Sequence, residues 1–318
     1  MKRSGQIGFS PFKSIKGDGV NMKFLILLAF FYLSLPLGRA SENEVWIPAQ
    51  KINDKFISAY LTNGNQWCSP ATLIGPNVFL TSAHCLPLIG HSKKIQIVGL
   101  NNNQKVAIRN TYSHDSIISE DEFFSGEECK NTFESINDKS QLKPSELLKC
   151  WYSGGKSDVA IIVTEADFTA PMFSISSRKI DSGEQISFLR YADGCGGEVG
   201  NYSLAQLDVF GFQKNQMVLN GNHQNGSTVK NCGGSGGPYF SKKLDGSVEV
   251  IGLHSAGTRA NLELTIYGKR VFLPANFLGG THLRSQEVWQ WLNQIAAEKN
   301  LKICGVNFPC QPVFLPIY

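Results

Sequence analysis

Three short strings in this sequence carry residues that could act together as a nucleophile, a base and an acid. The first places His84 before Cys85 at the end of an apolar run, and the second opens an apolar run with Asp158. The third places Ser235 in the string Cys232-Gly233-Gly234-Ser235-Gly236-Gly237-Pro238. A serine hydroxyl becomes a good nucleophile when an imidazole accepts its proton and a carboxylate orients that imidazole. The strings therefore predict acyl-transfer chemistry, with Ser235 as nucleophile, His84 as general base and Asp158 as the orienting acid.

The glycines around Ser235 suit the same chemistry. They allow a tight turn, and the backbone N–H groups of Gly233 and Ser235 can bind the oxyanion that forms during attack, an interaction worth about 3 kcal/mol. The pattern Gly233-x-Ser235-x-Gly237 also matches the nucleophile elbow of α/β-hydrolases. That elbow needs a helix directly after the serine and the chain order Ser, Asp, His. Pro238 and the order His, Asp, Ser argue against it.

The elements that must position these residues are predicted to be strands. From residue 55 onward, short apolar runs rich in β-branched and aromatic residues alternate with Gly, Asn, Asp and Pro. Because amphipathic helices do not intervene, the pattern predicts an all-β barrel or sandwich. The expected strands are 56–61, 71–74, 78–82, 95–98, 106–109, 159–163, 185–191, 204–212, 216–219, 238–240 and 248–254.

Two segments have a helical pattern. Residues 285–298 carry an apolar stripe at helical spacing, with Ser285 as the N-cap. A shorter helix is predicted over residues 145–151. The polar stretch 113–142 is rich in Glu, Asp, Asn and Ser, and we interpret it as a long surface loop.

The charge distribution argues against nucleic acid as a partner. The whole chain of 318 residues has a net charge of +4, from 30 basic and 26 acidic residues. Residues 1–40 hold six of the basic residues and one of the acidic ones, which leaves 24 basic and 25 acidic residues in the rest. The remainder is nearly neutral and has no basic stripe that could neutralise phosphates.

The N-terminal segment resembles a secretion signal. Lys23 precedes an apolar run from Phe24 to Leu37, and Gly38-Arg39-Ala40 follows, which predicts a signal peptide over residues 1–40 with Met22 as an alternative start. The run is too short to span a bilayer. All eight cysteines follow residue 40, and none has the Cys-x-x-Cys spacing. We therefore expect disulfides, a secreted or periplasmic location and no stable membrane insertion.

Taken together, the strings resemble the chymotrypsin-like (trypsin-type) serine peptidases. The residues 81–85 resemble that family's Thr-Ala-Ala-His-Cys, 158–162 its Asp-Ile-Ala-Leu-Leu, and 233–238 its Gly-Asp-Ser-Gly-Gly-Pro. Residues 251–257 resemble its substrate-binding strand, and 288–295 its C-terminal helix. The resemblance covers roughly residues 55–298.

This resemblance implies two six-stranded antiparallel β-barrels with a C-terminal α-helix and a site in the seam between the barrels. The first barrel, residues 41–170, would carry His84 and Asp158, and the second, residues 171–284, would carry Ser235. The helix 285–298 and a disulfide-closed tail, 299–318, would follow. The implied activity is that of a secreted serine endopeptidase acting on protein or peptide through an acyl-enzyme. We expect no metal or cofactor and a monomer.

The same resemblance implies a disulfide between Cys68 and Cys85. Proximity and exclusion then suggest three further pairs, since eight cysteines allow 105 connectivities. They are Cys129–Cys150, Cys195–Cys232 and Cys304–Cys310.

Gly234 departs from the family pattern. Trypsin-type zymogens place an Asp there, which pairs with a newly cut N-terminus. The expected mature N-terminus, Ser41-Glu42-Asn43-Glu44, also lacks an apolar Ile-Val-Gly-Gly start. Our hypothesis is that this chain does not use N-terminal insertion for activation.

The residues expected to contact substrate leave the preference open. Val229 falls near the floor of the expected pocket, with Lys230 beside it, and residues 220–234 contain no acid. His254 stands where glutamyl endopeptidases place a histidine, which would favour Glu or Asp before the cleaved bond. The alternatives are a small or apolar preference, with His254 as a structural strand residue. Ser255 and Gly257 are expected to pair with the substrate backbone.

Two other functions fit the same strings. A binding protein could keep the fold without catalysis, although such relatives usually lose a triad residue. An esterase on the same scaffold would use the same acyl chemistry.

Overall fold

The computed structural model describes residues 44–48, 58–62, 67–92, 94–99, 102–114, 127–150, 157–191, 201–221, 234–257, 263–272 and 276–315. Several sequence-based predictions lie outside these residues. They are the signal peptide 1–40, the pair Cys195–Cys232, and the site residues Val229, Lys230 and Gly233.

Six antiparallel strands of the N-terminal half close into a barrel in the order β2-β3-β4-β8-β6-β5. Its interior is filled by apolar side chains that alternate along the strands, such as Leu73, Phe79 and Ile162. Phe79 meets Phe168 edge to face, with ring centroids 5.6 Å apart. The strands are β2 (Ser58–Thr62), β3 (Trp67–Gly75), β4 (Val78–Thr81), β5 (Lys94–Gly99), β6 (Asn102–Ser113) and β8 (Ala160–Thr164), and the 3-10 helix η2 (Ala83–Ser92) follows β4.

A second barrel of six antiparallel strands forms from the C-terminal half. It closes because β9 pairs with both β10 and β12, and β1 (Glu44–Pro48) adds to the outer edge of β10. Its interior contains Phe188, Tyr239, Met217 and Ile251. The strands are β9 (Gln185–Tyr191), β10 (Asn201–Gln213), β11 (Gln216–Asn220), β12 (Pro238–Lys242), β13 (Val248–Gly257) and β16 (Phe277–His282).

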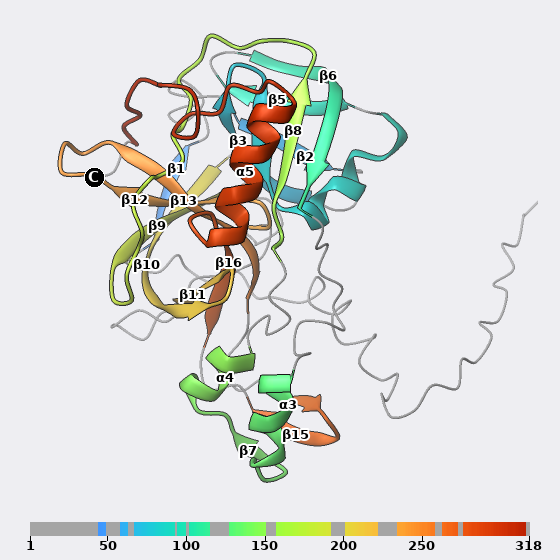
Figure 1. The fold of residues 1–318 in the computed structure, drawn as a ribbon, viewed down its shortest axis with the longest axis vertical. Helices are drawn as coiled ribbons and strands as arrows, with labels where there is room; N and C mark the ends of the chain where they lie inside the picture. The colour runs from blue at the N-terminus through green and yellow to red at the C-terminus, as the bar shows by residue number, and fades with distance from the viewer. Residues whose placement is uncertain are drawn as a thin grey trace, which may run out of the picture.

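Helix α5 (Gln286–Glu298) begins directly after Ser285 and lies over the junction of the two barrels (Figure 1). Its buried side chains, among them Val288 and Leu292, join a core that contains Val159 of the first barrel and Leu253 of the second. The predicted fold class, all-β with two six-stranded antiparallel barrels and a C-terminal helix, is therefore confirmed.

An accessory lobe projects beyond β11 and β16, at the lower end of Figure 1. It consists of α3 (Glu127–Glu134), β7 (Ser140–Gln141), α4 (Pro144–Cys150), β14 (Glu263–Ile266) and β15 (Lys269–Phe272). The interpretation of residues 113–142 as a long loop is wrong at Ser113, which ends β6, and over residues 127–134 and 140–141, which form α3 and β7; residues 115–126 lie outside the described residues. Helix α3 buries only Cys129 and Phe133, one turn apart, and these pack on residues distant in sequence, such as Val271. Eight mostly polar residues carry too little periodicity to indicate this helix.

The accessory lobe joins excursions from both barrels. β7, from the connection between β6 and β8, pairs in parallel with β15, from the connection between β13 and β16. The Lys269 ammonium donates to the carbonyls of Phe133 (2.6 Å), Glu134 (2.9 Å) and Ile136 (2.6 Å) at the C-terminal end of α3. A cation there satisfies carbonyls that have no partner within the helix.

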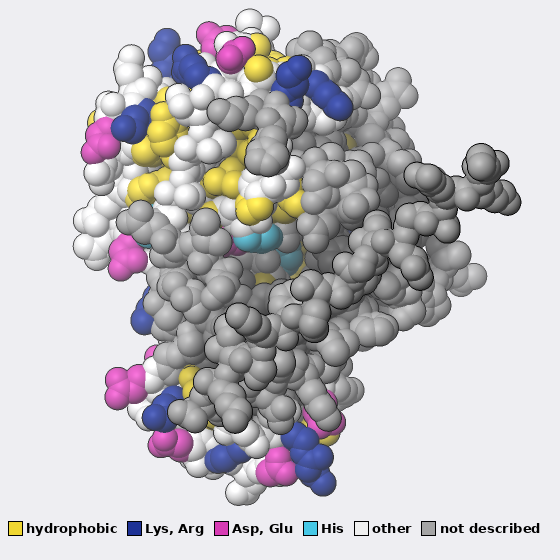
Figure 2. All heavy atoms as spheres, turned by 90° about the vertical axis from the view of Figure 1, so that its right-hand side faces the viewer, with side chains coloured by type: hydrophobic (Ala, Val, Ile, Leu, Met, Phe, Trp, Pro, Cys, Tyr) yellow, Lys and Arg dark blue, Asp and Glu magenta, His cyan; other side chains and the backbone are white. Residues whose placement is uncertain are grey.

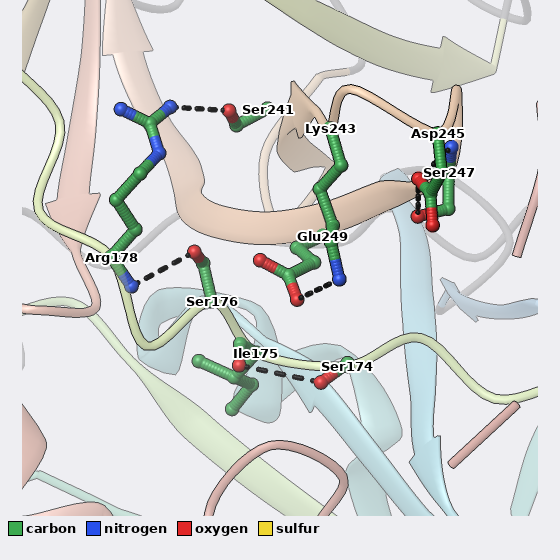
Figure 3. Close-up of polar contacts among 9 residues, drawn as sticks. All are labelled: Ser174, Ile175, Ser176, Arg178, Ser241, Lys243, Asp245, Ser247 and Glu249. Carbon is green, nitrogen blue, oxygen red and sulfur yellow. Dashed lines mark hydrogen bonds and ion pairs between the residues drawn. The ribbon is translucent and has the colours of Figure 1, made fainter. Parts of the chain in front are cut away.

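The chain between the two barrels is fixed to the second barrel by polar contacts (Figure 3). The Arg178 guanidinium donates to Ser241 Oγ at 2.7 Å, and the Arg178 amide donates to Ser176 Oγ. In the turn between β12 and β13, Asp245 Oδ1 accepts hydrogen bonds from the amide and hydroxyl of Ser247. The Arg178–Ser241 hydrogen bond joins the connection to β12, whereas the Asp245–Ser247 contacts hold the turn itself.

Three disulfides are present among the described residues: Cys68–Cys85, Cys129–Cys150 and Cys304–Cys310. The last lies in the segment after α5, where the Cys304 amide donates to the Ile74 carbonyl and the Cys304 carbonyl accepts from the Ile175 amide. That segment therefore links the first barrel to the inter-barrel connection. In the part of the chain that is described, no helix has the length and apolar character needed to cross a membrane.

Candidate active site

Neighbouring strands bring His84 and Asp158 together. His84 lies three residues after the end of β4, Asp158 lies two residues before β8, and the register pairs Thr81 with Ala160. His84 Nδ1 lies 2.6 Å from Asp158 Oδ2, and the His84 amide donates to Asp158 Oδ1 at 2.9 Å. The Asp158 side chain is 1% exposed and the His84 side chain 33%. The Asp158 carboxylate is thus buried, whereas the His84 imidazole is partly exposed.

The two groups shift each other's pKa in opposite directions. Burial alone would raise the pKa of Asp158, but the charge and hydrogen bonds of His84 outweigh it and lower that pKa, with a smaller contribution from the Ser255 hydroxyl. Burial alone would lower the pKa of His84, but the charge and hydrogen bond of Asp158 raise it. An ionised Asp158 accepts the Nδ1 proton, which leaves His84 Nε2 as a proton acceptor.

The loop that carries Ser235 is shaped by glycines. Gly236 has φ of +82°, a left-handed conformation that favours glycine, and the Gly237 amide donates to the Gly234 carbonyl at 2.8 Å. A Cβ at Gly236 would overlap Thr81 Oγ1 and lie 3.3 Å from the Ser82 amide nitrogen. The residue after Ser235 is therefore packed against the residues that lead into His84. We call residues 234–237 the nucleophile loop, after the role that the sequence predicts for Ser235.

His254 ties the nucleophile loop to the first barrel. Its carbonyl accepts hydrogen bonds from the Gly236 amide (2.8 Å) and from Ser82 Oγ (2.9 Å). Because Ser82 belongs to the first barrel and Gly236 to the second, one backbone carbonyl joins the two sides of the seam. Figure 2 shows histidine side chains near the middle of one face, bordered by hydrophobic side chains.

The segment Ser255–Gly257 ends β13 beside this loop. The pairing with β16 shifts register between His254 and Ala256, which marks a β-bulge at Ser255. On the other side, β12 pairs with β13 only as far as Leu253. The segment has no strand partner on that side among the described residues.

The structure thus brings His84, Asp158, the Ser235 loop, His254 and Ser255 to one place. His254 is 1% exposed, and its Nδ1 lies 2.6 Å from the Tyr239 hydroxyl.

Sequence reasoning missed Ser82 and Tyr239. One signal for Ser82 was available, because the family string that resembles residues 81–85 has Ala at that position. Tyr239 directly follows Pro238, and nothing in its local sequence indicates contact with His254.

One group of side chains has the proximity of a metal site. Ligand atoms of Cys68, His84 and Cys85 lie within 4.8 Å of one another. The two sulfurs are bonded to each other, so neither is available as a thiolate ligand.

Two six-stranded antiparallel barrels with a C-terminal helix are consistent with a chymotrypsin-like fold. No protein-family model matches the chain, and no curated protein matches its sequence.

Proposed function

We propose that this chain is a chymotrypsin-type serine endopeptidase that cleaves peptide bonds through an acyl-enzyme. The observation that carries the proposal is the buried Asp158 carboxylate 2.6 Å from Nδ1 of a part-exposed His84, beside a nucleophile loop packed against Thr81 and Ser82. An imidazole held by a buried carboxylate next to a serine on a glycine loop is what acyl transfer requires.

In the first half-reaction, Ser235 Oγ attacks the peptide carbonyl carbon while His84 Nε2 takes the hydroxyl proton. Asp158 stabilises the imidazolium, and the N–H groups of Gly233 and Ser235 bind the oxyanion. His84 then gives its proton to the leaving amine as the C–N bond breaks. In the second half, water attacks the ester, His84 accepts a water proton and returns it to Ser235 Oγ, and the acid product leaves.

The end of β13 supports a peptide substrate. Ser255–Gly257 presents an edge that β12 does not cover, and an extended peptide can add to such an edge as a strand. Main-chain hydrogen bonds there would hold the substrate in register with Ser235. In this proposal Ser255 and Gly257 bind substrate backbone.

The preference for the substrate side chain before the cleaved bond depends on the role of His254. Selection of Glu or Asp would require His254, with Lys230, to meet the substrate side chain. The burial of His254 and its hydrogen bond with Tyr239 favour the other alternative, a small or apolar side chain before the cleaved bond.

The three disulfides support action in an oxidising compartment, secreted or periplasmic.

The test is digestion of a mixed peptide library by purified, disulfide-bonded protein, read by mass spectrometry beside Ser235→Ala. We expect cuts that depend on Ser235, and a stoichiometric Ser235 adduct with a sulfonyl fluoride. Hydrolysis of small esters without peptide cleavage would replace the proposal with an esterase. A folded protein that gives neither cuts nor an adduct would be a binding protein instead.

A further inference from the structure

His254 contacts three of the four residues of the nucleophile loop. Its carbonyl accepts from the Gly236 amide at 2.8 Å, and its amide donates to the Gly237 carbonyl at 2.8 Å. Its side chain lies against Gly234. The same carbonyl also accepts from Ser82 Oγ at 2.9 Å.

The orientation of the His254 ring is set by its neighbours. Nδ1 lies 2.6 Å from the Tyr239 hydroxyl, and the ring packs against Phe188 with centroids 4.9 Å apart. A Cβ built on Gly234 would lie 2.9 Å from His254 Cδ2, 3.4 Å from Nε2 and 2.7 Å from Phe188 Cζ. The ring therefore has one edge on Tyr239 and the opposite edge on Gly234.

These contacts explain why residue 234 is glycine. The space that any side chain at this position would need is filled by Phe188 and His254. An aspartate there, as in trypsin-type zymogens, would have no room on this backbone. Gly234 instead packs against two buried rings, those of Phe188 and His254.

We infer that His254 is a positioning residue for Ser235: locked by Tyr239, its imidazole supports Gly234 and keeps the nucleophile loop in its working geometry. The inference rests on the proposed function, because it assigns a role in acyl transfer. In this arrangement the support comes from the interior of the second barrel, and no newly cut N-terminus is needed.

The side chain can be tested apart from the backbone. Any residue other than proline at position 254 keeps the two loop hydrogen bonds made by its amide and carbonyl, whereas only the imidazole both bonds Tyr239 and fills the space under Gly234. A change of about 1 Å at a nucleophile can cost about 100-fold in rate. We therefore expect His254→Val to lower kcat by roughly 10- to 100-fold and to change KM little, because the loop acts in the transition state. Tyr239→Phe should lower kcat less, in the same direction.

A matched control is available in the same barrel. His282 is also buried and packs on Phe212 with centroids 4.9 Å apart, almost the geometry of His254 on Phe188. His282→Val and His254→Val should both lower the melting temperature, but His282→Val should leave kcat within about twofold of the unchanged protein. In all variants, the low-field proton NMR signal between His84 and Asp158 should persist, which separates loop displacement from loss of that pair.

A compensating pair gives the sharpest test. Gly234→Ala alone should lose activity, because the new methyl group overlaps Phe188 and His254. His254→Val removes one of these two contacts and leaves a void beside the Phe188 ring, into which that ring can move away from the new methyl group. The double variant Gly234→Ala/His254→Val should therefore have a higher kcat than Gly234→Ala, a coupling that independent sites do not show.

The outcomes separate this inference from the proposed function. If the unchanged protein does not hydrolyse peptides in a Ser235-dependent way, the proposed function fails. If it does, but His254→Val and His282→Val lower kcat equally, or the two changes at 234 and 254 are simply additive, then His254 is a core residue and the inference is overturned.

Discussion

The Nδ1 atom of His84 and the Oδ2 atom of Asp158 lie 2.6 Å apart, although the two residues are 74 positions apart in the chain. The antiparallel pairing of β4 with β8 makes this contact, because each residue lies within three positions of the end of one of these strands. The Asp158 carboxylate is buried and the His84 ring is partly exposed. The proton on Nδ1 is therefore held against the buried carboxylate, and Nε2 can exchange a proton with another group.

The pH dependence of activity should follow the raised pKa of His84. Protonated His84 cannot accept the Ser235 proton, so kcat/KM should rise with pH and level off above a pKa higher than the ordinary imidazole value. In Asp158→Asn the charge that raises this pKa is gone and burial lowers it. We expect the acidic limb to move to lower pH while kcat falls by about 10⁴-fold. Steady-state kinetics between pH 5 and about 9 test this, and an unmoved limb in Asp158→Asn would contradict it.

Gly236→Ala should remove activity and destabilise the protein by about 1–3 kcal/mol. Alanine would be strained at φ of +82°, and its methyl group would overlap Thr81 Oγ1. Gly183→Ala is the matched control, because Gly183 has φ of +86° with nothing within 4 Å of a built Cβ. The control should show the backbone cost alone, about 1 kcal/mol, and normal kcat. Equal effects of both changes in chemical unfolding would argue against packing of the loop on the first barrel.

Lys269→Met should loosen the accessory lobe. The change keeps most of the side chain's length but leaves three carbonyls at the end of α3 without their cationic donor, at a cost of about 2 kcal/mol. Lys243→Met is the control, since Lys243 makes one exposed ion pair with Glu249 and should matter by less than about 1 kcal/mol. Hydrogen exchange should become faster in α3 for Lys269→Met alone. Unchanged exchange there would mean that the disulfide and Phe133 hold the helix without Lys269.

Ser82→Ala should weaken the seam between the barrels. The hydroxyl of Ser82 donates to the His254 carbonyl at 2.9 Å, and its loss should cost about 1 kcal/mol. The second acceptor position of that carbonyl would be empty while its bond to Gly236 remains. Thermal unfolding and kcat should both show a small decrease, and no change in either would indicate that the Gly236 bond alone fixes the carbonyl.

The strands of the barrels and α5 were predictable because their signals are local, whereas the arrangement in two six-stranded barrels was implied by the family resemblance. Alternating apolar residues indicate strands wherever they occur, and the apolar stripe that begins after Ser285 indicates the helix at Gln286–Glu298. In the lobe, α4 (Pro144–Cys150) lies where a helix was predicted over residues 145–151. Helix α3 was not predictable in this way, because it is stabilised by Lys269 and Val271, more than 130 residues along the chain.

Within the site, sequence alone identified His84, Asp158 and Ser235 as candidates, because their chemistry imposes short strings with restricted residue types. Only the tertiary structure placed Tyr239 and Phe188 around the His254 ring and that ring under Gly234. The sequence specifies the type of each side chain, but the strand register determines which side chains become its neighbours. The pairing of Tyr239 with Gly252 and with Phe188 sets which residues face the nucleophile loop from inside the barrel.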